Sequence, residues 1–393
     1  MRTARATSQI DALAEQSEPY KNFISSLDSE VTKNGYRYSL RYFMRFLKID
    51  NYNDLLKIEP TKLEGIIRDF IVNMRQDRKL SPSTVSVRIA AIAHFFEMND
   101  VDLRWKKLKK FKGKFRNIIE DKPYTREQIK KLIDRAVLRD KATIALMASS
   151  GMRRGALPHL RLRDMEHIEK YGILKFNVYK KEQESYTTYC TPECTQLINQ
   201  YLRWREKLGE RFTPDTPLFR REFDTVTQVN RPHPIQSASI AKRINKLLED
   251  TEIRISVQNG RHTELMETHA FRKFFKTTCI NAGMNPLYSE YLMGHKSGLT
   301  KSYFKPSDTE LLEGNDKALG YASAINDLTI NEEFRLRKKV DELTKKKGEI
   351  ELMEIKHNQE IKAMRDELKQ EMRSQISQLI TRLKPEIIQQ GLS

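Results

Sequence analysis

Apolar residues recur at helical spacing in the first hundred positions of this 393-residue chain. The clearest set places five apolar side chains at i, i+4, i+7, i+8 and i+11: Tyr36, Leu40, Phe43, Met44 and Leu47. This spacing keeps one face of a helix apolar, so the pattern predicts an amphipathic helix that packs against a core.

Two further helices are predicted, each with a start signal. Pro60 and a capping box of Thr61 with Glu64 announce the first. Its buried face would consist of Leu63, Ile66, Ile67, Phe70 and Ile71. The second starts at Ser81 with Pro82 in its first turn, and its apolar positions are Val87, Ile89, Ala90, Ala93 and Phe96. We therefore expect a compact helical domain over residues 19–103, preceded by a flexible tail over residues 1–18.

A second domain, over residues 123–320, mixes helices with a small sheet. A capping box of Thr125 with Gln128 opens its first helix. Residues 142–150 are nearly all small or apolar, which indicates a buried helix that ends at Gly151. Residues 172–180 and 185–191 are rich in β-formers and predict a hairpin, with Lys180 and Lys181 at its first corner.

The last segment, residues 331–384, has few turn-formers and predicts one long helix. Its apolar seam has heptad spacing and consists of Leu336, Val340, Leu343, Ile350, His357, Ile361, Met364 and Leu368. Lys347 and Glu354 interrupt this seam. We interpret the segment as a coiled coil, with a solvated single helix that carries i,i+4 ion pairs as the alternative.

The charge of the chain points to a polyanionic partner. Lys and Arg number 71 against 53 Asp and Glu, which gives a net charge of +18 and an isoelectric point near 9.6. Such a surplus suits nucleic acid, although it says nothing about sequence preference or chemistry.

Residues 104–116 concentrate this charge, with eight basic residues in thirteen and no acidic one. We interpret residues 104–122 as a basic interdomain linker that follows a phosphate backbone, because they separate two folded domains. The residues expected to contact DNA are Lys106, Lys107, Lys109, Lys110, Lys112, Lys114 and Arg116. A solvated linker without a ligand is the alternative.

Several other classes of protein are excluded by what the sequence lacks. It has no run of about 18 apolar residues and no apolar signal-peptide core, so we expect an intracellular, cytoplasmic protein associated with the nucleoid and without a membrane partner. Three cysteines cannot form a disulfide framework, and Cys190 and Cys194 lack a second Cys or His pair, so no metal site is expected. No GxxxxGK[ST] loop is present, and we expect no cofactor.

One segment, residues 268–306, gathers side chains that are competent to act on a phosphodiester. It holds His269, Arg272, His295 and Tyr303, and Arg153 lies upstream in GMRRGAL. His269 lies three residues before Arg272, which places both on one face of a helix. Paired guanidiniums can hold the non-bridging oxygens of a phosphate, and a tyrosine can attack its phosphorus.

These motifs resemble those of the tyrosine recombinases, the family of phage integrases and of Xer-type, Cre-like and archaeal-type enzymes. GMRRGAL resembles the first arginine box, HAFRKFF the His-x-x-Arg box, and YLMGHK the Leu-Gly-His box that precedes the tyrosine. The likeness covers residues 20–310. It implies a mainly α, multidomain protein with a helical, SAM-like core-binding domain, a mixed α+β catalytic domain and a carboxy-terminal long helix.

The resemblance also implies a role for each motif residue. Arg153, Arg272 and His295 would bind the phosphate, His269 would assist proton transfer, Tyr303 would be the nucleophile, and Lys180 would protonate the leaving oxygen. Three positions depart from the family pattern. Ala156 stands where the family usually has an acidic residue, Arg154 makes the choice of arginine ambiguous, and the hairpin lacks the Gly-Lys-Gly turn, so Lys181 is an alternative to Lys180.

The implied function is site-specific recombination of double-stranded DNA through a 3′-phosphotyrosyl intermediate, for integration or excision of a mobile element. The implied assembly is a homo-oligomer on DNA, with a dimer at each site and a tetrameric synapse. Two alternatives share parts of this machinery: a DNA-binding relative without catalysis and a nickase of the type IB topoisomerase kind. A covalent adduct would exclude the first, and relaxation of supercoils without site preference would favour the second.

Overall fold

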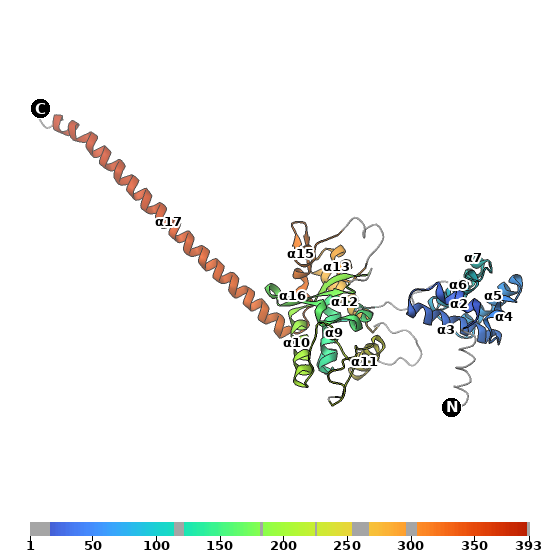
Figure 1. Cartoon of the computed structure of the whole chain (residues 1–393). Helices are drawn as coiled ribbons and strands as arrows, with labels where there is room; N and C mark the ends of the chain where they lie inside the picture. Colours follow the sequence, from blue (N-terminus) through green and yellow to red (C-terminus); the bar gives the residue numbers. More distant parts are fainter. Residues whose placement is uncertain are drawn as a thin grey trace. The chain divides into compact units, whose positions relative to one another are not determined.

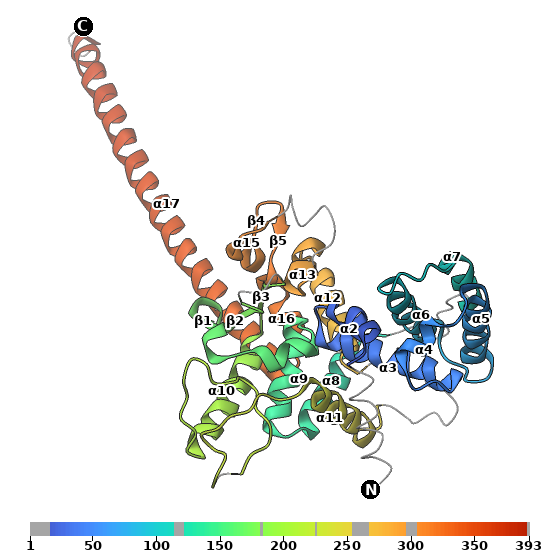
Figure 2. The same cartoon turned by 45° about the vertical axis from the view of Figure 1, so that its right-hand side comes forward.

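The computed structural model describes residues 16–113, 122–180, 184–224, 226–253, 267–295 and 305–390, and the two views in Figures 1 and 2 show them. Within 332–390 the side chains of residues 338, 342 and 380–390 are not described. The chain divides into two compact units, Met1–Ile118 and Ile119–Ser393. Each unit has its own hydrophobic core.

The first unit is helical. Its helices are α2 (Glu18–Ser25), α3 (Glu30–Leu47), α4 (Tyr52–Leu56), α5 (Pro60–Gln76), α6 (Pro82–Glu97) and α7 (Trp105–Leu108), followed by the 3-10 helix η1 (Lys109–Lys112). The predicted face of α3 is confirmed, because Leu40, Phe43 and Met44 are buried. Phe70 of α5 packs against Phe43 with ring centroids 5.0 Å apart.

The predicted start signal of α5 is wrong in detail. The N-cap is Glu59, whose carboxylate accepts hydrogen bonds from the backbone amides of Thr61 and Lys62. Pro60 occupies the first turn as expected, but Glu64 binds Arg104 instead of the helix terminus. A carboxylate one residue before the proline therefore satisfies the free amides of this helix.

The buried face of α6 also differs from the prediction. Val87 is 54% exposed, whereas Val85, Ile89, Ile92 and Phe96 are buried. These four residues follow the i, i+4, i+7, i+11 spacing, and Val87 lies on the other side of the same helix. The helix is apolar on more than one side, so the sequence alone does not decide which of its faces is buried.

Part of the basic segment folds onto the helical unit. Leu108 is buried, and Trp105 and Phe111 pack against the core of that unit. Arg104 donates to Glu64 over distances of 2.5–2.9 Å, and Arg75 donates to the carbonyl oxygen of Phe111 at 2.7 Å. The side chains of Lys106, Lys107, Lys109 and Lys110 are exposed on this folded turn, and Lys112 is half-buried. Lys114 and Arg116 lie outside the described residues.

The second unit packs helices around a three-stranded antiparallel sheet. Its strands, in the order β1-β2-β3, are β1 (Met165–Ile168), β2 (Ile173–Val178) and β3 (Tyr186–Tyr189). The predicted hairpin is confirmed by the pairing of β2 with β3, whereas β1 was not predicted. The predicted fold class, mainly helical with a small sheet, is also confirmed.

Helices surround this sheet and supply most of the core. They are α8 (Arg126–Arg135), α9 (Leu138–Ser150), α10 (Pro192–Lys207), α11 (Ser237–Asp250), α12 (His269–Asn281), α13 (Pro286–Leu292), α15 (Asp308–Glu313) and α16 (Ile325–Leu328). Short elements connect them: η2 (Arg154–His159), η3 (Leu162–Asp164), η4 (Glu169–Tyr171), η5 (Tyr321–Ala324), β4 (Gly314–Asn315) and β5 (Ala318–Leu319). The capping box of Thr125 with Gln128 forms as predicted at the start of α8.

Helix α9 forms the centre of this unit and is buried over most of its length, as predicted. Two side chains from elsewhere in the unit hold its last turn. The Tyr321 hydroxyl donates to the Ser149 carbonyl oxygen at 2.8 Å, and the Thr188 hydroxyl donates to that of Ser150 at 2.9 Å. The end of α9 is therefore fixed immediately before the first arginine box.

Helix α17 (Glu332–Gln390) continues from the second unit, and its helical character is confirmed. Glu193 anchors its start by accepting hydrogen bonds from the backbone amides of Ile330 and Asn331 at 2.7 and 3.1 Å. No helix in the described part of the chain is both long and apolar enough to cross a membrane.

Candidate functional site

Arg272 lies at the centre of the candidate site, on the buried side of α12. Its guanidinium donates hydrogen bonds to the backbone carbonyl oxygens of Gly151 and, at 3.3 Å, Met293. It is 7% exposed. Two carbonyls from distant turns thus fix the plane of the guanidinium without neutralising its charge.

Both turns require glycine. Gly151 has φ +61°, and a Cβ placed there would lie 2.4 Å from the Cδ1 of Phe275. Gly294 has φ +68°, and a Cβ there would lie 2.7 Å from the ring of Tyr186. Only glycine allows these turns to approach the packed side chains so closely.

His295 follows Gly294 and contacts Arg272. Its Nε2 lies 2.6 Å from Nη2 of Arg272, and its Nδ1 is hydrogen-bonded to the carboxylate of Glu290. The other carboxylate oxygen of Glu290 pairs with Lys276 of α12. Burial would raise the pKa of Glu290, but hydrogen bonds from Lys276 and His295 outweigh it and lower the pKa. Sequence reasoning missed Glu290 and Lys276, although both lie within or beside the predicted boxes.

Arg153 reaches the same place from the end of α9. Its Nη1 donates to the Gly294 carbonyl oxygen at 3.4 Å, and its side chain is exposed. Burial and the neighbouring charge of Arg153 together lower the pKa of Arg272 to about 10. The two cations therefore repel each other in a partly dry environment, and an anion between them would relieve this repulsion.

Arg154, the alternative to Arg153, points to a different set of partners. It donates to the Ser237 hydroxyl at 3.0 Å and lies 3.5 Å from the carboxylate of Glu267. Ala156, at the position that is usually acidic in the family, is fully buried.

Tyr186 at the start of β3 is a further residue that sequence reasoning missed. Its side chain is 9% exposed; the hydroxyl oxygen faces the backbone amide of Arg153, but the hydroxyl donates its proton to no described residue. Burial raises its pKa well above the ordinary value, although the guanidiniums of Arg272 and Arg153 act in the opposite direction. The hydroxyl is thus a neutral, buried donor that lies near both arginines.

The remaining predicted residues are placed less completely. His269 is the first residue of α12, and its side chain is exposed. Lys180 is exposed just beyond the end of β2, after Tyr179, which has φ +53°. Tyr303 and Lys181 lie outside the described residues.

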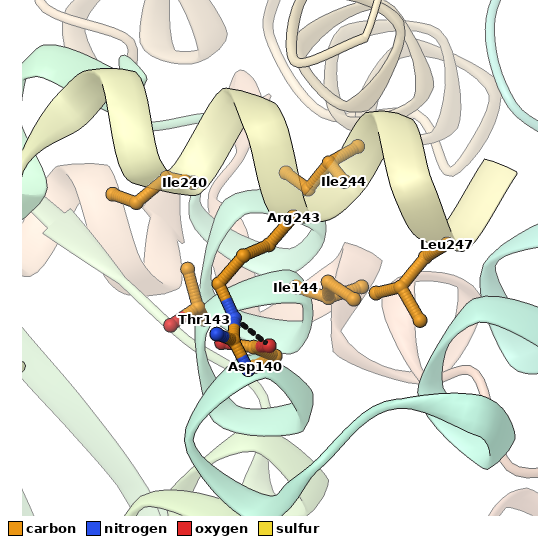
Figure 3. Close-up of a pocket in the computed structure, with 7 residues that line it drawn as sticks. All are labelled: Asp140, Thr143, Ile144, Ile240, Arg243, Ile244 and Leu247. Carbon is orange, nitrogen blue, oxygen red and sulfur yellow. Dashed lines mark hydrogen bonds and ion pairs between the residues drawn. The ribbon is translucent and has the colours of Figure 1, made fainter. Parts of the chain in front are cut away.

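A small pocket between α9 and α11 contains the ion pair of Arg243 with Asp140, at 2.5 Å, among apolar side chains, as Figure 3 shows. None of the residues around Arg272 lines it. Among the described residues, no three His, Cys, Asp or Glu side chains are arranged to hold a metal ion. Cys190, Cys194 and Cys279 are buried free thiols.

The arrangement around Arg272 has the chemical groups that could hold a phosphate. Arg153, Arg272 and His295 present nitrogen atoms around two backbone turns, and the hydroxyl of Tyr186 lies beside them. Guanidiniums bind phosphate oxygens in pairs, and rigid donors of this kind can stabilise charge that develops during phosphoryl transfer.

Comparisons with known proteins identify a family to which this chain is similar. Residues 123–310 match the phage integrase family. The chain is 24% identical over 312 residues to tyrosine recombinase XerC of Thermodesulfovibrio yellowstonii, a match that covers 74% of this chain and 91% of that protein. It is 29% identical over 125 residues to tyrosine recombinase XerS of Streptococcus thermophilus, which covers 32% of this chain and 33% of XerS. The chain thus matches about a third of the length of these XerS relatives.

A solved structure shares the fold. The integrase of transposon Tn1549, in complex with a circular intermediate DNA, aligns with 77% of this chain and 96% of its own, at 15% identity and a TM-score of 0.52. The family match includes all three boxes that converge on Arg272. This chain belongs to the phage integrase family of tyrosine recombinases.

Proposed function

We propose that this protein is a site-specific DNA recombinase that cleaves and rejoins strands through a 3′-phosphotyrosyl intermediate. The convergence of Arg153, Arg272 and His295 from three distant segments carries the proposal. Membership of the phage integrase family and the net charge of +18 support it. Integration or excision of a mobile element is the proposed role.

The reaction uses the phosphate as its electrophile. Arg153, Arg272 and His295 bind the non-bridging oxygens and stabilise the charge that develops on them. The phenolic oxygen of Tyr303 forms a bond to phosphorus while the bond from phosphorus to the 5′ oxygen breaks. His269 accepts the tyrosine proton, and Lys180 gives a proton to the 5′ oxygen.

The intermediate retains a phosphodiester, which makes rejoining possible without an external energy source. The 5′-hydroxyl of a second strand attacks the phosphotyrosine and gives its proton to Lys180, while the bond from phosphorus to the Tyr303 oxygen breaks and His269 returns a proton to that oxygen. Neither a metal ion nor a nucleotide is required for either step.

Double-stranded DNA is the proposed partner. The Tn1549 integrase with the same fold was solved in complex with DNA. In this chain the helical unit contributes the exposed lysines Lys106, Lys107, Lys109 and Lys110, which would bind phosphates. Two chains would occupy one site and four would form the synapse, in a nucleoid-associated assembly.

Covalent trapping tests this proposal. The protein is incubated with a nicked suicide substrate from the attachment region of its host element, denatured, and examined for a protease-sensitive adduct. We expect an adduct with the wild type and with Tyr291→Phe, a half-buried tyrosine on α13, and none with Tyr303→Phe. An adduct that persists in Tyr303→Phe would assign the nucleophile elsewhere, and tight binding without any adduct would favour a non-catalytic DNA-binding protein.

A further inference from the structure

Lys276, Glu290 and His295 form a chain of polar contacts that the assigned catalytic roles do not use. Glu290 lies on α13, where one carboxylate oxygen pairs with Lys276 and the other with Nδ1 of His295. The Glu290 side chain is 26% exposed, so both contacts are partly shielded from water. The chain ends at Arg272, which contacts the other ring nitrogen of His295.

The contacts define the protonation of His295 in this state. A guanidinium has only donors, so Arg272 donates and Nε2 of His295 accepts. The proton of a neutral ring is then on Nδ1, which donates to Glu290. To donate from Nε2 to a phosphate oxygen, His295 must gain a second proton and become a cation.

We propose that Glu290 is a positioning residue that orients His295 and balances the positive charge His295 acquires when it donates to the DNA phosphate. Lys276 keeps the Glu290 carboxylate ionised and in place. The proposal rests on the proposed recombinase function.

The chain offers a matched pair with which to separate this role from surface electrostatics. Nδ1 of His167 lies 2.7 Å from the carboxylate of Glu169, which is 89% exposed. Both pairs join a glutamate to Nδ1 of a histidine, but only that of Glu290 leads to Arg272. Replacing Glu169 therefore controls for loss of one glutamate beside one histidine.

The test measures single-turnover cleavage of the suicide substrate and, separately, DNA affinity. We expect Glu290→Gln to cleave about tenfold more slowly with its Kd for DNA within about twofold of wild type, by analogy with the loss of a carboxylate that orients a metal-bound histidine, which costs about tenfold or more. Glu290→Asp should recover part of the rate, Lys276→Gln should lose less, and Glu169→Gln should match wild type. Combining Glu290→Gln with His295→Gln should cleave no more slowly than His295→Gln alone.

Each outcome decides a different question. A wild-type rate in Glu290→Gln, or losses that add when the His295 change is combined with it, would overturn the positioning role. Loss of DNA binding together with cleavage would show a structural role instead, and thermal unfolding of each variant identifies that case. Absence of an adduct with the wild type would refute the recombinase function itself.

The exposed apolar seam of α17 carries a second, independent inference. Seven of its members, which lie on one face, are between 47% and 59% exposed: Leu336, Val340, Leu343, Ile350, Ile361, Met364 and Leu368. Among the described side chains of α17, ion pairs at i,i+4 form in Arg337–Glu333 and Lys347–Glu351, and they leave the apolar seam uncovered. Each such pair stabilises a helix only slightly.

The charged residues that flank the seam favour parallel pairing of α17 with the same helix of a second chain. In that arrangement Lys346 faces Glu351 of the other copy and Glu360 faces Arg365, and the other flanking pairs bring no like charges together. The antiparallel register that matches apolar layers also pairs Lys339 with Glu367 and Lys346 with Glu360, but it places Arg337 opposite Arg365 and Glu351 opposite itself. We infer that α17 pairs with α17 of a second chain as a parallel two-stranded coiled coil, with Lys347 and Glu354 fixing the register at some cost in stability.

Disulfide trapping of the full chain without DNA tests this pairing. Under mild oxidation Val340→Cys should form a cross-linked dimer as its main product, whereas Lys345→Cys, on the opposite face of the helix, should not. The native cysteines are buried and should not interfere. A Val340→Cys chain that cross-links to Met364→Cys instead of to itself would establish the antiparallel arrangement, and a wild-type chain that sediments as a monomer at tens of micromolar would overturn self-pairing.

Discussion

Replacing Tyr186 by phenylalanine should raise the stability of the protein while lowering its activity. The Tyr186 hydroxyl is buried beside the backbone amide of Arg153, and it donates its proton to no described residue. A buried polar group in that state costs about 1–3 kcal/mol, and removing it leaves only a small void. We expect the net free energy of unfolding to rise by about 1 kcal/mol, which corresponds to about 2–4 °C in Tm for a unit of this size.

Tyr189 on the same strand provides the matched control. Its hydroxyl donates to the Asp308 carbonyl oxygen at 2.8 Å, so Tyr189→Phe breaks a formed hydrogen bond. We expect that variant to lose about 0.5–1.5 kcal/mol. Chemical denaturation of both variants measures the difference, and a Tyr186→Phe protein that is less stable than the wild type by 1 kcal/mol or more would show that the hydroxyl already has an acceptor for its proton.

The activity of Tyr186→Phe tests what the hydroxyl does when DNA binds. It lies near Arg153 and Arg272, where a phosphate oxygen would accept its proton in a hydrogen bond. Hydrogen bonds to charged groups contribute about 1.5–3 kcal/mol, so cleavage should fall at least about tenfold. An unchanged cleavage rate in a correctly folded variant would refute contact between Tyr186 and the phosphate.

Three other substitutions probe separate parts of the chain. Gly151→Ala should cost about 2–4 kcal/mol of unfolding free energy, since a Cβ there meets Phe275 in a left-handed conformation; an undiminished Tm would contradict this. The pKa of Glu64 is lowered to about 2 by Arg104, so its contribution is complete above the ordinary carboxyl pKa and is lost as pH falls from 4.5 towards 2. Acid titration of Glu64→Gln should therefore lack that step. Neutralising the lysines at 106, 107, 109 and 110 should reduce the slope of log K against log salt by about 3 to 4, and an unchanged slope would exclude DNA contact there.

The sequence predicted those parts of the site that depend on local spacing. A buried helix ended by glycine placed Arg153 correctly at the end of α9, and the prediction follows from the small and apolar residues of that helix. Hydrophobic periodicity likewise identified α3 and α5, and β-formers identified the hairpin. Convergence of Arg272 with the turn at Gly294 is a tertiary contact that periodicity does not encode, and only the family motifs indicated it.

The residues that were missed have ordinary local patterns. Glu290 and Lys276 read as polar residues on helix faces, where charged side chains are usually solvated. Tyr186 reads as one of several aromatic residues in a strand, because tyrosine is common there. Glu59 does not stand out as a helix N-cap in the sequence, because Ser, Thr, Asp and Asn are the usual residues at that position. Each acquires its role from a partner distant in sequence or from an uncommon choice of residue.

The features around Arg272 form one electrostatic system. Burial and Arg153 disfavour the charge on Arg272, and the buried hydroxyl of Tyr186 donates its proton to no described residue, so both are costs in the protein alone. A phosphate would relieve both at once, because it supplies negative charge and hydrogen-bond acceptors at the same point. Glu290 does not compete for the arginines, since its carboxylate is occupied by Lys276 and His295. Glu290 can therefore stabilise a protonated His295 without neutralising Arg153 and Arg272. The two arginines then keep their positive charge for a bound phosphate.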